Sequence, residues 1–248
     1  MYQYTPVTID GKAQEWKIPL DYYDDKTKLN FSISNDKTNI YFCIRATEDE
    51  TQKGIMHTGL QIWIDTTGGK KSQVGIQFPI VQRTGMGSSS SRHSQQSSSS
   101  NENPMAHSLK SQYAGTEKQI RLTGFSNAPA GLAEVPNMYG INACLNWDTN
   151  NIMIYEVCIP FNAFYKASLS SSDTNKLLGI SFVLTVTPPN EGGGGHSGGG
   201  MGGSGMGGMG GGMHGGGHGG GGHGGGGGSS GPESLTAHVK IRLAVPNK

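Results

Sequence analysis

Apolar and polar residues alternate along much of this chain with the period of two that is typical of a half-buried β-strand. Leu29, Phe31 and Ile33 lie on one side of the first such run. A polar turn at 35–37 follows, and the alternation resumes over residues 40–46. Successive side chains of a strand point to opposite faces, so one face of each run is expected to be buried. The two runs predict a β-hairpin.

A second hairpin is predicted from residues 60–65 and 74–78, which alternate in the same way on either side of a Gly-containing turn at 67–70. In the first of these runs, Trp63 falls on the face opposite the aliphatic residues. The indole is therefore expected either to lie under a covering layer or loop, or to face solvent. An exposed Trp63 would be a candidate binding residue.

Further strand-like runs complete the pattern at residues 119–125, 140–147, 151–159, 178–186 and 238–243. Pro160 ends one run, and residues 161–165 are expected to form a short helical turn after it. The segments between runs, residues 48–53 among them, are polar, and no amphipathic helix of three turns is apparent. About nine or ten such runs predict an all-β fold, an antiparallel β-sandwich that forms a single domain over residues 1–248.

Two low-complexity segments interrupt this pattern. Residues 85–103 are mostly Ser with Gln, Gly and Asn, and they contain nothing that could form a core, so they predict a disordered surface insertion. Residues 192–228 are glycine broken only by two serines, four histidines and four methionines. Glycine loses much entropy on ordering and has no side chain to bury, so a solvated loop is expected. It lies between two predicted strands, which should hold both of its ends.

The composition of the second loop suggests metal chemistry. Its side chains longer than Ser are His196, Met201, Met206, Met209, Met213, His214, His218 and His223. Thioethers are soft ligands suited to Cu(I), and neutral imidazole suits copper, zinc and nickel. The loop is therefore predicted to capture a transition metal, copper first and nickel or zinc as alternatives. The same composition also fits an inert spacer or a protein-binding loop.

Charge and hydropathy exclude several classes of partner. The formal net charge is +1 and no basic run stands out, so neither nucleic acid nor an anionic membrane surface is expected as a partner. No apolar stretch approaches the roughly 18 residues of a membrane-spanning helix. Residues 1–4 do not resemble a secretory leader, so the protein is expected to be cytosolic or to have lost a leader before this numbering begins.

The three cysteines are too far apart in sequence for a zinc knuckle. A hairpin around residues 148–151 would place Cys144 opposite about Tyr155 and not opposite Cys158. These cysteines are therefore expected to be free thiols, and Cys43 with them.

Several short motifs follow one another along the chain: Ile9-Asp10-Gly11-Lys12 with Trp16, Asn35-Asp36 before Asn39-Ile40-Tyr41-Phe42, residues 59–65, Tyr155-Glu156-Val157 with Ile159-Pro160-Phe161, and Gly179-Ile180-Ser181-Phe182. Their order resembles that of the family 9 carbohydrate-binding modules and of the wider DOMON-like β-sandwiches. The resemblance covers about residues 5–245 apart from the two insertions. It implies a secreted or envelope-facing domain that binds sugar or, in cytochrome relatives, haem.

Within that resemblance, sugar binding would need aromatic rings as stacking platforms, which Trp16, Trp63 and Trp147 could supply. Trp16 belongs to a scaffold motif and Trp147 lies next to a turn, which leaves Trp63 as the candidate carbohydrate residue. Haem is not expected, because the adjacent Met56 and His57 cannot bind one iron from opposite sides.

Catalysis is not expected. Most carboxylates lie at turns, where short acidic side chains bond their own backbone, although such turns could also hold a structural calcium ion. No nucleophile elbow, HExxH sequence or phosphate-binding loop occurs. The sequence thus predicts a non-enzymatic, secreted or cell-envelope domain whose loop captures a metal. A carbohydrate-binding module with an inert loop and a structural surface or assembly protein are the alternatives, and the oligomeric state stays open.

Overall fold

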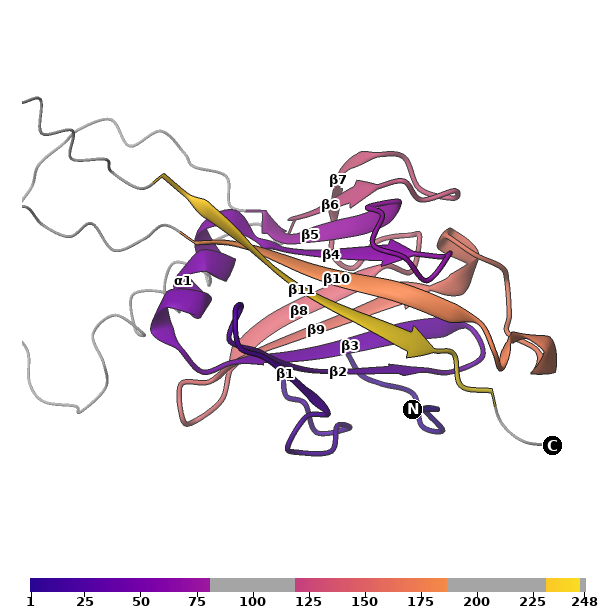
Figure 1. Cartoon of the computed structure of the whole chain (residues 1–248), viewed down its shortest axis with the longest axis horizontal. Coiled ribbons are helices and arrows are strands. Elements are labelled where there is room, and N and C mark those ends of the chain that lie inside the picture. The colour runs from indigo at the N-terminus through magenta and orange to yellow at the C-terminus, as the bar shows by residue number, and fades with distance from the viewer. Residues whose placement is uncertain (81–118, 187–230, 246–248) are drawn as a thin grey trace, which may run out of the picture. The chain divides into compact units, whose positions relative to one another are not determined.

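The computed structural model describes residues 1–80, 119–186 and 231–245, and the two predicted insertions, 85–103 and 192–228, lie outside this part of the chain. Met1–Thr187 and Pro232–Lys248 form one compact unit. It contains two antiparallel sheets packed face to face, as Figure 1 shows. The predicted all-β sandwich is therefore confirmed.

We call the two layers the first sheet and the second sheet. The first sheet has the strand order β1 (Tyr22–Asp24), β2 (Leu29–Asn35), β3 (Asn39–Ala46), β9 (Met153–Pro160), β8 (Asn142–Trp147). The second sheet has the order β11 (Glu233–Arg242), β10 (Leu177–Val186), β4 (Leu60–Asp65), β5 (Val74–Ile80), β6 (Gln119–Thr123), β7 (Gly131–Glu134).

The core lies between the inner faces of the sheets. Phe31 of the first sheet meets Phe182 of the second with 4.5 Å between ring centroids, and Phe42 meets the same ring at 6.2 Å. The fully buried Tyr155 reaches across the core, where its hydroxyl donates a hydrogen bond to the carbonyl of Phe78 over 3.0 Å. The apolar half of each alternating run supplies these contacts, which is why the period of two located most strands.

Several elements follow the prediction closely. β2 pairs with β3 and β4 pairs with β5, so both predicted hairpins are confirmed. A short 3₁₀ turn, η1 (Phe161–Ala163), follows β9 as expected. β10 and β11 pair from Leu177 opposite Arg242 to Val186 opposite Glu233, so the chain between them joins two neighbouring strands.

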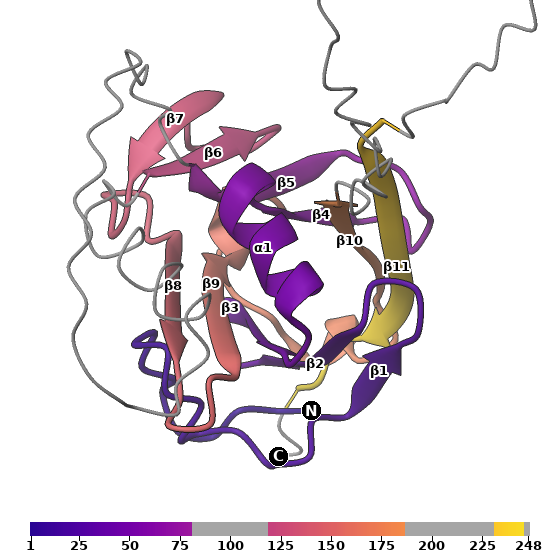
Figure 2. The same ribbon diagram turned by 90° about the vertical axis from the view of Figure 1, so that its left-hand side faces the viewer.

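One helix was missed. α1 (Asp49–Thr58) begins in the predicted polar connection and lies across one end of the sandwich, as Figure 2 shows. Asp49 and Glu50 at its N-terminus suit the helix dipole, and Gly59 with φ 74° ends it. Its buried side includes polar Thr51 and Gln52, so its sequence lacks a clear apolar stripe.

Four smaller predictions were wrong. β1 lies where a connection was expected, β7 was not foreseen because it has only 4 residues, and β11 begins five residues earlier than predicted. Cys144 lies opposite Glu156 and not Tyr155, because Trp147 pairs with Met153 and the turn is one residue longer than assumed. The free state of the three thiols is nevertheless confirmed.

The N-terminal segment up to residue 21 packs on the outer face of the first sheet. Val7, Ala13 and Trp16 form a second, smaller apolar cluster with Tyr41, Cys43 and Ile154 of β3 and β9. As for membrane insertion, none of the helices in the described ranges is long and apolar enough to cross a bilayer.

Candidate functional site

The outer face of the first sheet is organised by one buried carboxylate. Glu156 is fully buried; its Oε2 accepts hydrogen bonds from the backbone N–H groups of Gly11 (2.8 Å) and Asp10 (3.2 Å), and its Oε1 accepts one from the indole of Trp16 (2.9 Å). Burial raises the pKa of this carboxyl, although the three donors oppose the shift. Gly11 has φ 75°, and a Cβ there would lie 2.6 Å from the Cβ of Asn146.

These are the same residues that carry much of the resemblance to carbohydrate-binding modules. Their role here is to attach the N-terminal segment to the sheet. Trp16 is about 9% exposed, so its ring cannot serve as an open platform.

Trp147 is also part of the scaffold. Its indole N–H donates to Oε1 of Gln52 over 2.9 Å, and the amide of Gln52 donates to the carbonyls of Ala46 (3.0 Å) and Asn151 (2.9 Å). The ring therefore ties β8 to α1 at one end of the sandwich. Of the three tryptophans, Trp63 is then the remaining candidate for ligand binding.

Trp63 lies on the outer face of the second sheet. It is half-buried and is paired across the strands with Ser181 of β10 and Gly75 of β5. Because opposed residues of a ladder share a face, the register surrounds the indole with side chains from five strands. We call this set the Trp63 face: Gln61, Trp63, Gln77, Arg121, Thr123, Ser181 and His238.

Gly75 makes room for the indole. A Cβ on Gly75 would lie 2.4 Å from Cε3 and 2.7 Å from Cδ2 of Trp63, so the six-membered ring occupies the space that any other residue would fill. The indole N–H donates to Oε1 of Gln61 over 3.0 Å, which fixes the ring from the side. The ring thus projects across β5 toward β6 and is held in one orientation.

Polar groups surround the ring. Gln77 donates from Nε2 to the carbonyl of Thr58 (2.6 Å), and the hydroxyl of Ser181 lies 3.0 Å from Nδ1 of His238. Burial, and then the charges of Lys70 and Lys240, lower the pKa of His238. Its Nε2 is buried with no hydrogen-bond partner in the described residues. Arg121 is exposed, and no ion pair to it occurs in the described part of the chain.

This arrangement suits a neutral or anionic polar ligand with one apolar side. An aromatic ring offers an apolar surface with a negative face, while amide, hydroxyl and guanidinium groups offer hydrogen bonds around it. The sequence identified Trp63. It missed the surrounding residues, although the alternation of Arg121 and Thr123 with buried Ile120 and Leu122 already placed those two on an outer face.

Several other acidic groups have structural partners. Asp36 and Asp65, for example, accept turn N–H groups from Asn39 (2.6 Å) and Lys71 (2.9 Å), respectively. Within the described ranges, no group of three or more His, Cys, Asp or Glu side chains could hold a metal ion. The eight predicted metal-binding residues between His196 and His223 lie outside those ranges.

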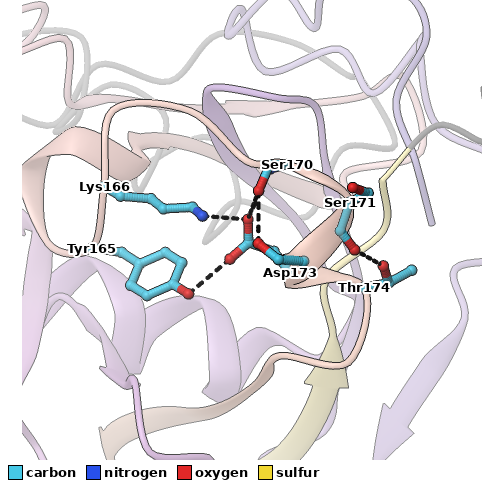
Figure 3. Close-up of polar contacts among 7 residues, drawn as sticks. Tyr165, Lys166, Ser170, Ser171, Asp173 and Thr174 are labelled. Carbon is cyan, nitrogen blue, oxygen red and sulfur yellow. Dashed lines mark hydrogen bonds and ion pairs between the residues drawn. The ribbon is translucent and has the colours of Figure 1, made fainter.

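Asp173 illustrates such a structural carboxylate, shown in Figure 3. It lies in the 3₁₀ turn η2 (Ser171–Asp173), accepts hydrogen bonds from the hydroxyl of Tyr165 (2.9 Å) and the backbone N–H of Ser170 (2.8 Å), and forms an ion pair with Lys166. Burial alone raises the pKa of this carboxyl, but these partners outweigh it and hold the pKa well below its usual range. The cluster fixes the connection between β9 and β10.

Comparison with known proteins gives one weak match to a solved structure. No family model matches the chain, and no curated protein matches it. The chain is similar to the solved structure of a family 9 carbohydrate-binding module from Caldicellulosiruptor kristjanssonii in complex with glucose. The identity is 8%, the TM-score is 0.34, and the match covers 75% of this chain and 77% of that chain. A likeness of this size says nothing about ligand or activity.

Proposed function

We propose that the protein is a non-catalytic module that binds a glycan on the Trp63 face. The observation that carries this proposal is the half-buried indole of Trp63, held over Gly75 on a sheet face whose neighbouring side chains are mostly polar. A ring held in one orientation on an outer face amid hydrogen-bonding groups offers a ligand an apolar surface with polar partners around it.

The chemistry of a sugar ring fits this face. One side of a pyranose presents C–H groups, which pack on the negative face of an aromatic ring. Its hydroxyls point outward and need donors and acceptors. Gln61 accepts the indole N–H through its oxygen, so its NH₂ group can donate to a ligand, and Thr123 and Arg121 stand on the next strand but one.

Binding to a panel of soluble glycans tests the proposal, by affinity electrophoresis followed by calorimetry of any that bind. Trp63→Ala is expected to weaken binding about tenfold or more, because it removes the stacking surface. Tyr23→Ala is the matched control, because Tyr23 is 55% exposed on the first sheet and should not contribute. Equal losses in the two variants, or no binding to any glycan, would reject the proposal.

A second candidate function is capture of a transition metal by residues 192–228, with copper preferred over nickel and zinc. It is supported by the ligand-rich composition of the segment. It is also supported by the pairing of Val186 with Glu233, because a connection whose ends are held on neighbouring strands needs less ordering when it closes on an ion.

Calorimetric titration with Cu(I), Cu(II), Ni(II) and Zn(II) tests this second candidate. The protein is compared with a variant in which the four histidines and four methionines of the segment become serine. Tight uptake by the protein alone supports metal capture, and equal uptake by both excludes it. Deleting residues 192–228 should leave glycan binding unchanged, which separates the two candidates.

Either function suits a secreted or envelope-facing protein, and protease accessibility on intact cells tests that location.

A further inference from the structure

Positive groups stand on both sides of Trp63. On one side, Arg121 of β6 lies opposite Gln77, which lies opposite Gln61. On the other side, Lys240 of β11 lies opposite Gly179, which lies opposite Asp65. Opposed residues share a face, so both cations project from the same outer face as the indole.

Two carboxylates of the described residues share this face with the cations. Asp65 is on the same face, but it is 1% exposed and accepts hydrogen bonds from Thr67 (2.8 Å) and Lys71 (2.9 Å). Glu134 lies on β7, at the edge of the sheet, opposite Gln119 and not opposite Arg121. Arg121 therefore keeps its positive charge on this face without an ion-pair partner among the described residues.

The lowered pKa of His238 agrees with this charge distribution. Besides burial, Lys70 and Lys240 lower the pKa of His238, and only Asp65 among the nearby charges opposes them. His238 touches Ser181, the direct cross-strand neighbour of Trp63. Positive charge thus also lies near the strand beside the indole.

We infer that the glycan bound on the Trp63 face carries carboxylates, as in a polymer of uronic acids, and that Arg121 is the residue that selects it. This inference rests on the proposed glycan binding. The indole projects over β5 toward β6, and neighbouring strands lie about 4.8 Å apart, so a sugar on the ring lies within reach of the Arg121 side chain. A guanidinium matches a carboxylate with two parallel hydrogen bonds, which makes Arg a selective partner for it.

The test compares polygalacturonate, an acidic polymer, with neutral dextran, xylan and soluble cellulose derivatives. The wild-type protein, Arg121→Gln and Lys26→Gln are measured at low and high salt. Lys26→Gln is the matched control, since it removes the same charge from an exposed position beyond β1 on the first sheet. Circular dichroism confirms that each variant is folded.

The protein is expected to bind polygalacturonate at least about tenfold more tightly than the neutral glycans, and salt should weaken that binding. Arg121→Gln should lower the affinity about tenfold or more, and Lys26→Gln should leave it unchanged. Neutral glycans bound as tightly as polygalacturonate, with loss on Trp63→Ala, would overturn the acidic preference and keep the proposed function. Absence of binding to every glycan would overturn both.

Discussion

The outer face of each sheet carries a tryptophan, but the two tryptophans have different surroundings. On the first sheet, the N-terminal segment covers the face, and Trp16 donates its indole N–H to the buried Glu156. On the second sheet, Trp63 donates its indole N–H to Gln61 of its own strand and stays half-buried. A tryptophan on an outer face is therefore structural or available for binding according to what covers it.

The largest expected effect is the difference in stability between two tryptophan variants. Trp16→Ala should lower the free energy of unfolding by about 3–5 kcal/mol, because it empties the cluster under the N-terminal segment. Trp63→Ala should cost less, about 1–2 kcal/mol, since part of that ring is already in contact with water. Urea denaturation of both variants checks this. Equal losses would mean that the two faces do not differ as described.

Two variants of Glu156 test how the N-terminal segment is held on the outer face of the first sheet. Glu156→Ala leaves three N–H donors, two of them in buried hydrogen bonds, without an acceptor and should cost about 3 kcal/mol, whereas Glu156→Gln keeps one acceptor and should cost less. The pKa of Glu156 is raised, so the folded protein binds this proton more tightly than the unfolded chain does. The stability of the wild type relative to Glu156→Gln should therefore rise as the pH falls through the raised pKa. A fall in that difference would contradict the buried carboxylate.

A variant of Asp173 should show a pH dependence opposite to that of Glu156, and so it provides a contrast to the Glu156 test. Because its pKa is lowered, its stabilisation is present above the ordinary pKa of an aspartate and is lost as the pH falls toward the folded value. Asp173→Asn should lower the free energy of unfolding by about 1–2 kcal/mol at pH 7, with a smaller loss in acid. Thermal melts between pH 3 and pH 7 measure it. A loss that does not change with pH would argue against the ion pair with Lys166.

The smallest expected effect is that of one methyl group under the platform. Gly75→Ala places a Cβ in the space of the Trp63 ring and should displace the indole at a stability cost of about 1 kcal/mol. Glycan affinity should fall severalfold because the platform tilts. Tryptophan fluorescence and calorimetry follow both changes, with Gly231→Ala as a control, since nothing lies within 4 Å of a Cβ there. An unmoved ring with unchanged affinity would show that Gly75 does not set the platform.

The alternation of residues predicted most strands because it reports which face is buried. It could not predict α1, whose buried side includes Thr51 and Gln52 bonded to the scaffold. The alternation placed Trp63 on an outer face. It could not show that Arg121 of β6 and Ser181 of β10, which are far apart in the sequence, lie on that same face. Register decides such neighbours, and a change of one residue, as at Cys144, turns a side chain to the other side.

The most direct test follows the three indole N–H signals by NMR while oligogalacturonides, and then neutral oligosaccharides, are added to the protein. The indoles of Trp16 and Trp147 are bonded within the scaffold, to Glu156 and Gln52. We predict that a bound glycan shifts the Trp63 signal and leaves those two in place. A glycan that binds without shifting the Trp63 signal would contradict the assignment of the binding site to the Trp63 face. Failure of every oligosaccharide to shift any of the three indole signals would contradict it as well.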